Sequence, residues 1–360
     1  MHRVVHAGTG LTGREALRAI IEDPALELVG VHVSTPAKVG VDAGDLCGMP
    51  VTGVMATDKW DEILALAPAC VCYCATAVRR EPDAVGDFVR LLEAGINVVA
   101  ISVIPMVYPP TAPPGWFAAL QEATQRGRST FYATGSEPGV LSLNVPTALL
   151  ACAGRVDSYR MDEYALGLDE SYPIWDVLHE SMGFGKPDGH VPTRIASGKV
   201  SADWETVVRY IADMLGLTLD RVEVDWETEL APDDLPTAVG VIARGTICAH
   251  RWQLAGMVDD RPVVAVQYFA TVSTTPWPER WPRPEGATTH AALVYRVHGR
   301  PQMSMQLTLD PHLPDDGANP GIVATAMAAV NAMPAVIHAP FGVAAQPLSG
   351  PTLAPRFNAS

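Results

Sequence analysis

The chain has 360 residues, a length that suits two domains better than one hydrophobic core. Its formal net charge of −15 speaks against the basic surface that nucleic acids and anionic membranes attract. No basic segment precedes an apolar run at the N-terminus, and the apolar stretch at 320–339 is interrupted by Asn331 and two prolines. We therefore expect a cytoplasmic protein without a membrane span.

Short apolar strands and amphipathic helices are predicted to alternate along the first 150 residues. The strands are expected at 3–8, 26–34, 70–76, 97–102 and 130–134, and the helices at 12–23, 58–66, 81–94 and 115–126. This repeated alternation predicts an α/β fold in which a Rossmann-type parallel sheet carries helices on both faces.

The pattern changes beyond residue 150, where the predicted strands become longer. They are expected at 156–165, 221–230, 240–255, 262–273 and 291–309, with turns at Asp259-Asp260 and at 299–301. Two helices, 174–182 and 203–215, interrupt them, the Pro- and Trp-rich stretch 274–286 is a loop, and an Ala-rich helix follows at 322–336. We predict an α+β domain with a mostly antiparallel sheet at 151–318, between a first domain at 1–150 and a C-terminal segment at 319–360.

A glycine-rich turn ends the first predicted strand and opens the first helix. Its residues are Gly8, Thr9, Gly10, Leu11, Thr12 and Gly13. In a strand–turn–helix context, the first glycine permits a tight turn, the second lets the backbone approach a pyrophosphate, and the third packs helix against strand. The helix N-terminus supplies free N–H groups. The turn therefore predicts dinucleotide binding, with an ordinary strand–helix turn as the alternative.

The residues after the second strand indicate which nicotinamide cofactor would bind. NAD-binding sites place an acid there, but this chain has Ser34, Thr35 and Lys38 and no acid among residues 33–38. Hydroxyl groups and an ammonium suit a 2′-phosphate, and Arg14 adds positive charge next to the turn. We expect NADP, with NAD as the alternative cofactor; Lys38 could instead be a solvated surface lysine.

The sequence offers no pattern typical of a metal site. Cys70, Cys72 and Cys74 alternate along one strand and so share one face, but their spacing alone does not complete a zinc tetrahedron. The ten histidines are scattered without pairs at metal-ligand spacing. We interpret the three thiols as small buried hydrophobic groups and expect no metal.

Several short motifs, in order along nearly the whole chain, resemble the NAD(P)-dependent amine dehydrogenases related to 2,4-diaminopentanoate dehydrogenase, whose N-terminal domain is dihydrodipicolinate-reductase-like. The matching stretches are 8–13, 38–48, 94–99, 134–135 with 138–139, 182–185, 324–326 and 330–334. The resemblance implies a dinucleotide-binding Rossmann domain, a second domain that supplies the substrate pocket and a homodimer contact, and a last helix that returns to the cofactor.

The same resemblance implies reductive amination of a ketone, or oxidative deamination of an amine in the reverse direction. It places Asn331 and Pro334 near the nicotinamide, and it places four residues at strand ends along the cofactor: Ala75, Thr76, Ala100 and Ile101. Taken without the resemblance, Asn331 is better explained as a packing or capping amide in an Ala-rich helix.

One departure from the family bears on the mechanism. Amine dehydrogenases carry a glutamate shortly after the strand at 97–102, where it meets the substrate nitrogen; here residues 100–106 contain no acid. A carboxylate near the reacting carbon stabilises iminium charge and relays protons. Glu137, after the strand at 130–134, is our candidate replacement. The alternative is a helix-start glutamate with Pro138 in the first helical turn.

Candidate substrate-pocket residues lie in both predicted domains. They are Val103, Glu163, Tyr164, Tyr172, Trp175 and His179. His179 is a candidate proton donor to a carbonyl oxygen. Glu163 shares a strand face with Tyr159 and Met161 and is as well explained by a solvent-facing position, and the aromatic residues are as well explained by core packing.

These observations favour an NAD(P)H-dependent oxidoreductase that transfers hydride to the carbonyl or imine carbon of a small ketone, imine or amine substrate. One alternative is a carbonyl or imine reductase that is independent of ammonia. The other is a non-catalytic NADP-binding regulatory protein. No nucleic-acid or membrane partner is expected.

Overall fold

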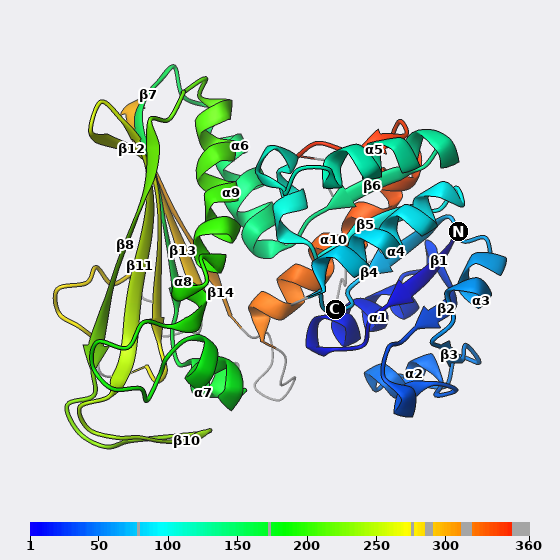
Figure 1. The fold of residues 1–360 in the computed structure, drawn as a ribbon, viewed down its shortest axis with the longest axis horizontal. Coiled ribbons are helices and arrows are strands. Elements are labelled where there is room, and N and C mark those ends of the chain that lie inside the picture. Colours follow the sequence, from blue (N-terminus) through cyan, green and yellow to red (C-terminus); the bar gives the residue numbers. More distant parts are fainter. Residues whose placement is uncertain (78–79, 172–173, 275–276, 285–290, 311–318, 348–360) are drawn as a thin grey trace, which may run out of the picture. The chain divides into compact units, whose positions relative to one another are not determined.

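The computed structural model describes residues 1–77, 80–171, 174–274, 277–284, 291–310 and 319–347. The chain divides into two compact units, which are drawn in Figure 1. The first contains Met1–Asn144 together with Ile322–Ser360, and the second contains Val145–Gly321. The C-terminal helix therefore belongs to the same unit as the N-terminal strands.

The first unit is built on a parallel sheet of seven strands in the order β15-β6-β5-β4-β1-β2-β3. Its strands are β1 His2–Ala7, β2 Leu26–His32, β3 Ala56–Thr57, β4 Cys70–Tyr73, β5 Asn97–Ala100, β6 Thr130–Ala133 and β15 Gly342–Val343. Without β15, this is the doubly wound order, in which the direction of winding reverses between β1 and β4. The predicted Rossmann-type sheet is confirmed.

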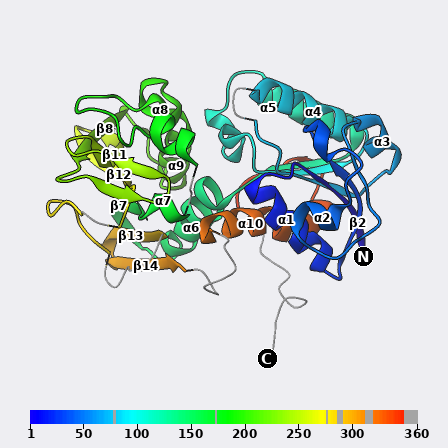
Figure 2. The same ribbon diagram turned by 90° about the horizontal axis from the view of Figure 1, so that it is seen from below.

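Helices cover both faces of this sheet, as Figure 2 shows: α1 and α10 lie on one face and α4 and α5 on the other. The helices are α1 Leu11–Glu22, α2 Ala43–Cys47, α3 Trp60–Ala65, α4 Glu81–Glu93, α5 Trp116–Gly127 and α10 Pro320–His338. Short 3-10 turns occupy 36–38, 104–107 and 109–111. Because both faces are covered, the central strands are largely buried; all four residues of β4 are buried.

The C-terminal helix α10 is a core element of the first unit. It is long and apolar enough to cross a membrane by length and composition alone, with a mean hydropathy of 1.6. However, six of its residues, from Ala326 to Val336, are buried in a cluster that includes Val4, Ala16 and Tyr132. After the helix, Gln346 hydrogen-bonds the Tyr132 hydroxyl and the Ala133 carbonyl. Its apolar composition is explained by this packing.

The second unit contains a six-stranded sheet in the order β14-β13-β7-β12-β11-β8. Its strands are β7 Arg155–Ala165, β8 Arg221–Leu230, β11 Ile247–Val258, β12 Arg261–Thr271, β13 Ala291–Arg300 and β14 Met303–Leu309. Only the β7–β12 pair among these is parallel. The predicted α+β unit with a mostly antiparallel sheet is thereby confirmed.

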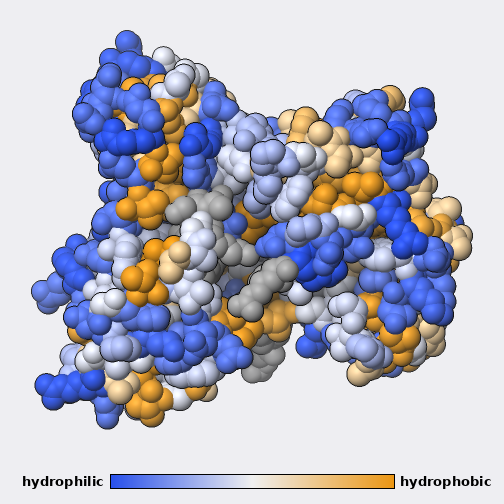
Figure 3. Space-filling view, in the orientation of Figure 1, coloured by the Kyte–Doolittle hydropathy of each residue, from blue (hydrophilic) through white to orange (hydrophobic). Residues whose placement is uncertain are grey.

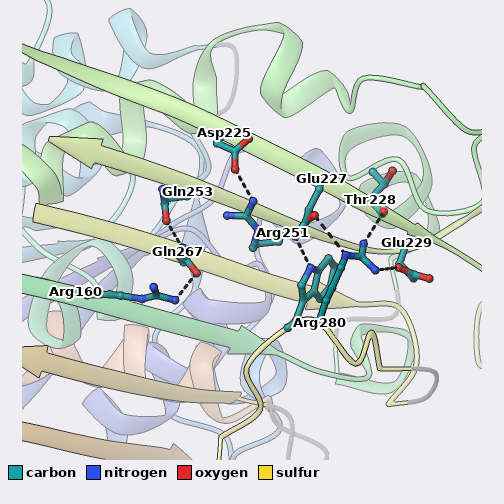
Figure 4. Close-up of polar contacts among 10 residues, drawn as sticks. Arg160, Asp225, Glu227, Thr228, Glu229, Arg251, Gln253, Gln267 and Arg280 are labelled. Carbon is teal, nitrogen blue, oxygen red and sulfur yellow. Dashed lines mark hydrogen bonds and ion pairs between the residues drawn. The ribbon is translucent and has the colours of Figure 1, made fainter. Parts of the chain in front are cut away.

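The two faces of this sheet differ in chemistry. One face packs against α9, Lys199–Met214, where Trp204 lies against Tyr268. The other carries a polar network, drawn in Figure 4, in which Arg160 donates to Gln267 and Arg251 pairs with Asp225. The unit is completed by α6 Val145–Leu150, α7 Leu168–Ser171, α8 Thr193–Ala196, a helical turn Val177–Ser181 and the hairpin β9 Leu235–Thr237 and β10 Gly240–Ile242. In Figure 3, hydrophilic residues cover much of the visible surface, with smaller apolar patches between them.

Three element predictions were wrong in detail. The strand expected at 240–255 is two strands, β10 and β11, because Gly245 adopts a φ of +78° and the chain turns there. The helix expected at 203–215 begins earlier, at Lys199, and the helix expected at 174–182 is a π-helix, Val177–Ser181, preceded by two α-helical residues. The turns expected at Asp259-Asp260 and at 299–301 do separate β11 from β12 and β13 from β14.

Candidate active site

The glycine turn between β1 and α1 has the geometry that the sequence predicts. Gly8 has a φ of +93°, and a Cβ there would lie 2.3 Å from the Ala75 nitrogen. A Cβ on Gly13 would lie 2.0 Å from the Gly8 carbonyl oxygen, so α1 sits directly on the turn. At Gly10, by contrast, a Cβ would meet nothing within 4 Å. The open side of Gly10 is where a pyrophosphate can approach the backbone.

The N-terminus of α1 at this turn keeps its donors available. Gly10 is the N-cap residue, and no side chain caps the first turn. The first backbone N–H groups of a helix otherwise have no partner and carry a partial positive charge, which favours an anionic ligand. Leu11 and Arg14 are exposed at the surface beside the turn, and Thr12 is half-buried. The residues present therefore fit a dinucleotide pyrophosphate.

Lys38 contacts the glycine turn directly. Its ammonium donates hydrogen bonds to the Thr9 carbonyl oxygen at 2.8 Å and to the Thr9 hydroxyl at 2.9 Å. Ser34 and Thr35, which follow β2, are exposed close to it in sequence. The structure thus places a positive charge beside the turn and the end of β2, which is where the adenosine ribose lies in Rossmann folds.

The carboxyl ends of β4 and β5 lie side by side, since the two strands pair in parallel. Ser102 bridges them, because its hydroxyl donates to the Ala75 carbonyl at 2.5 Å. Thr76 is exposed and Ile101 half-buried, whereas Ala100 is buried and its carbonyl accepts from the Thr134 N–H. Val103 is also buried, at 1% exposure. Sequence reasoning did not single out Ser102, although a hydroxyl at a strand end was the available signal.

Glu137 follows β6 but does not begin a helix. Its φ and ψ are −148° and 111°, and the φ and ψ of Pro138 are −65° and 144°, so both residues are extended. The helix-start interpretation of Glu137 was therefore wrong. Both Glu137 carboxylate oxygens are buried from solvent. A buried acid at the carboxyl edge of a doubly wound sheet is in the region where ligands bind in such folds.

Helix α10 is tied to the segment that carries Glu137. The Thr325 hydroxyl lies 2.5 Å from the Ser136 hydroxyl, one residue before Glu137. Asn331 and Pro334 lie further along the same helix, and both are half-buried. The first unit thus brings the glycine turn, the strand ends, Glu137 and α10 into one sheet-and-helix assembly.

The aromatic candidates of the second unit, together with His179, fall into three groups. Trp175 and His179 stack with ring centroids 4.6 Å apart, and His179 Nδ1 lies 2.6 Å from the Phe184 carbonyl oxygen. Tyr164 is fully buried in the core, stacked on Phe269, and burial raises its pKa to about 12. Core packing, the alternative given for Tyr164, therefore describes its position. Tyr172 lies outside the described residues.

Glu163 lies on the face of β7 opposite to Arg160. Arg160 donates to Asp162 and Gln267 on the polar face, and the alternation of the strand turns Glu163 to the side of Tyr159 and Met161. Glu163 is half-buried, and its Oε2 atom is buried from solvent. Glu163 therefore faces solvent only in part, and its place in a substrate pocket stays a prediction.

A cluster that sequence reasoning missed lies beneath the glycine turn. His6 on β1 is the register partner of Cys72 on β4, and Cys74 follows two residues later on the same face. Hydrogen bonding with Cys74 and the nearby His6 lowers the pKa of the Cys72 thiol to about 6, although burial opposes this shift. The prediction of a parallel sheet included no strand order, and only the observed order places β1 beside β4.

No family model matches the chain, but individual proteins do. It is 29% identical over 315 residues to an amine dehydrogenase from Streptomyces virginiae, covering 87% of this chain and 85% of that protein. A shorter stretch of 62 residues, 16% of this chain and 24% of the relative, is 45% identical to 4-hydroxy-tetrahydrodipicolinate reductase from Rubrobacter xylanophilus.

The chain is thus similar to amine dehydrogenase over most of its length. Its fold agrees, since the solved structure of amine dehydrogenase from Mycobacterium smegmatis superposes with a TM-score of 0.71 at 21% identity, covering 95% of this chain and 94% of that one. A putative myo-inositol dehydrogenase from Sinorhizobium meliloti superposes with a TM-score of 0.53, covering 94% and 88%. The resemblance stated from the sequence is confirmed, and the fold and homology are those of NAD(P)-dependent oxidoreductases.

Proposed function

We propose that the protein is an NADP(H)-preferring oxidoreductase that transfers hydride to a carbonyl or imine carbon of a small ketone-derived substrate, as an amine dehydrogenase does. The observation that carries this proposal is the homology to amine dehydrogenase, which runs through both units of the chain. The open backbone at Gly10 and the uncapped start of α1 support the cofactor half of the proposal.

In this mechanism, the nicotinamide supplies the hydride, and the protein supplies binding, orientation and charge. The turn at Gly8, Gly10 and Gly13 holds the pyrophosphate. Lys38, with Ser34 and Thr35, binds the 2′-phosphate of NADP, because no acid in 33–38 repels it. Arg14 adds positive charge at the exposed end of the turn. Asn331 and Pro334 on α10 lie against the nicotinamide ring of the bound cofactor in this proposal.

Glu137 is the proposed acid at the reacting carbon. Residues 100–106 provide no carboxylate where the resembling family has one, and Glu137 follows the next strand of the same sheet. Its carboxylate is buried, so its charge acts in a low-dielectric environment, where it stabilises an iminium or holds a proton more effectively than at the surface.

The apolar stretch at 100–106 also favours a second function, that of a reductase that does not need ammonia. Without a glutamate in this position, the protein has lost the group that meets the amine nitrogen in the family. A carbonyl reductase needs only the hydride and one proton donor. The two functions are separated by whether ammonia is a substrate.

The test is NADPH oxidation with a panel of small ketones, with and without ammonia. Ammonia-dependent turnover supports the amine dehydrogenase, and turnover without ammonia supports the reductase. Glu137→Gln should lower kcat at least about tenfold in either case. The control is Glu122→Gln, because Glu122 is an exposed residue on α5. Tight NADPH binding without any turnover overturns the proposal and leaves the regulatory protein.

We also propose a cytoplasmic homodimer formed through the second unit, the arrangement that the family implies. The second sheet has one face packed on α9, which leaves the polar face of Figure 4 as the surface for a partner copy. Light scattering on the purified protein tests this directly. A monomer at micromolar concentration contradicts it.

A further inference from the structure

The cluster of His6, Cys72 and Cys74 is buried and built from two paired strands. One ligating atom from each side chain lies within 4.8 Å of the others, and the two sulfur atoms are 3.7 Å apart. The exposures of the three residues are 0%, 0% and 8%, respectively. Since the His6–Cys72 pair is set by the register of β1 on β4, the protein fold, and not a mobile loop, holds these groups together.

The hydrogen bond of His6 fixes which of its nitrogens is available. Nε2 lies 2.6 Å from the carbonyl oxygen of Gly8, and a carbonyl can only accept, so Nε2 carries the proton. Nδ1 therefore carries the lone pair; it is buried from solvent, and the Cys72 thiol is its nearby polar partner. Histidines that ligate metals typically donate their other ring N–H to a backbone carbonyl or a carboxylate in this way.

We propose that His6 Nδ1, Cys72 Sγ and Cys74 Sγ form a binding site for a thiophilic divalent cation of the Zn²⁺ type. This site revises the expectation of no metal, which considered the cysteines and the histidines separately. The missing ligand of that argument is His6, which comes from the neighbouring strand.

The geometry and the charge suit such a cation. With zinc–sulfur bonds of about 2.3 Å, the 3.7 Å separation of the sulfurs gives a sulfur–metal–sulfur angle of about 107°, close to tetrahedral. Binding displaces one proton from each thiol, so two thiolates balance the 2+ charge and the imidazole remains neutral. No fourth histidine, cysteine or acid joins the group among the described residues. A water molecule would complete the tetrahedron.

A cation in this site would join the first strand to the fourth strand directly beneath the glycine turn. Because the folded protein presents the three ligands together and the unfolded chain does not, binding should raise the melting temperature in proportion to the logarithm of cation concentration. This readout, like binding itself, requires neither NADP nor a substrate. The inference therefore stands or fails independently of the proposed function.

The experiment is a titration of reduced, chelator-treated full-length protein with Cd²⁺, followed by the ultraviolet charge-transfer absorption of cadmium–thiolate bonds. We expect one equivalent to bind, and Zn²⁺ to displace it and to raise the melting temperature. Cys72→Ala and Cys74→Ala should each lose the band and the stabilisation. Cys70→Ala should keep both, because Cys70 is a buried thiol on the same strand face but outside the cluster.

Circular dichroism of the metal-free variants shows whether they are folded. If Cys72→Ala fails to fold, Cys74→Ala decides, and the exposed Cys152→Ala controls for adventitious binding. The absence of a cadmium band in the wild type overturns the proposal. A band that survives in both folded cluster variants, or disappears with Cys152→Ala, overturns it equally.

Discussion

The ammonium of Lys38 donates to both oxygen atoms of Thr9, the carbonyl and the hydroxyl, and so links the segment after β2 to the glycine turn. A lysine held in this way is not simply solvated at the surface. Its charge is kept where the 2′-phosphate of NADP lies when a Rossmann fold binds the cofactor. The proposed preference for NADP depends on this contact.

Lys38→Ala should weaken NADPH binding by about tenfold or more while changing NADH binding little, because one phosphate contact of a charged group is worth about 1.5–3 kcal/mol. Fluorescence titration with each cofactor measures both constants. Lys59→Ala, which removes an exposed lysine paired with Glu62 on α3, is the control. An equal loss for NADPH and NADH would mean that Lys38 only supports the turn.

Gly10 and Gly13 of the turn should respond differently to substitution by alanine. Gly10→Ala should leave the melting temperature unchanged and abolish dinucleotide binding, because its Cβ meets no protein atom but stands where the pyrophosphate approaches. Gly13→Ala should also destabilise the fold, because its Cβ would clash with the Gly8 carbonyl at 2.0 Å. Melting curves and NADPH titrations of the two variants separate the effects. Undiminished binding by Gly10→Ala would contradict the proposed pyrophosphate site.

Asp162 is expected to contribute strongly to the stability of the second unit. It is fully buried and pairs with Arg160 and Arg296 from two strands. Asp162→Ala should cost about 2–3 kcal/mol of unfolding free energy; this is below the usual 3–5 kcal/mol for a broken buried pair because both arginines retain partial contact with water. Urea unfolding measures it, and Asp157→Ala, in an exposed pair with Arg155, should be nearly neutral.

Asp42 should give the stability of the first unit a dependence on acid pH. It is buried, and hydrogen bonds from the backbone N–H groups of Thr52, Gly44 and Gly53 lower the pKa of its carboxyl group below the ordinary value of 3.8. A depressed pKa in the folded state means that its stabilisation is complete above the unfolded pKa of about 4 and is lost as pH falls below it.

Asp42→Asn should therefore lower the urea midpoint at pH 7, and the difference from the wild type should shrink progressively below pH 4. Asp45→Asn, on the exposed side of the same short helix α2, should change the midpoint little at either pH. If the urea midpoints of Asp42→Asn and the wild type differ by the same amount from pH 7 to pH 3, the loss of stability is not electrostatic.

The alternation of apolar strands and amphipathic helices was sufficient to predict the first sheet, because parallel strands buried on both faces are nearly continuous apolar runs. The brief helix Ala43–Cys47 and strand Gly342–Val343 were missed, since two to five residues carry no periodicity. The prediction of a single strand at 240–255 was wrong, because the chain turns at Gly245, whose positive φ interrupts the apolar run.

Site residues were predictable where one segment carries the chemistry, as in the glycine turn. Groups assembled from separate segments were not: His6 is 66 residues from Cys72, and only strand pairing makes them neighbours. Glu137 could be identified because an acid at the end of a predicted strand is visible in the sequence. Its extended backbone could not be predicted, since a Glu-Pro pair also begins helices.

The return of α10 to the first unit also has a consequence for the order in which the protein is made. Strands β1 to β6 leave the ribosome early, but the apolar face that Ala326, Val330 and Met333 cover stays open until the whole of Val145–Gly321 has been synthesised. The dinucleotide unit, although N-terminal, therefore completes its core after the second unit can fold. Nascent chains released before residue 320 should expose that face and depend on chaperones.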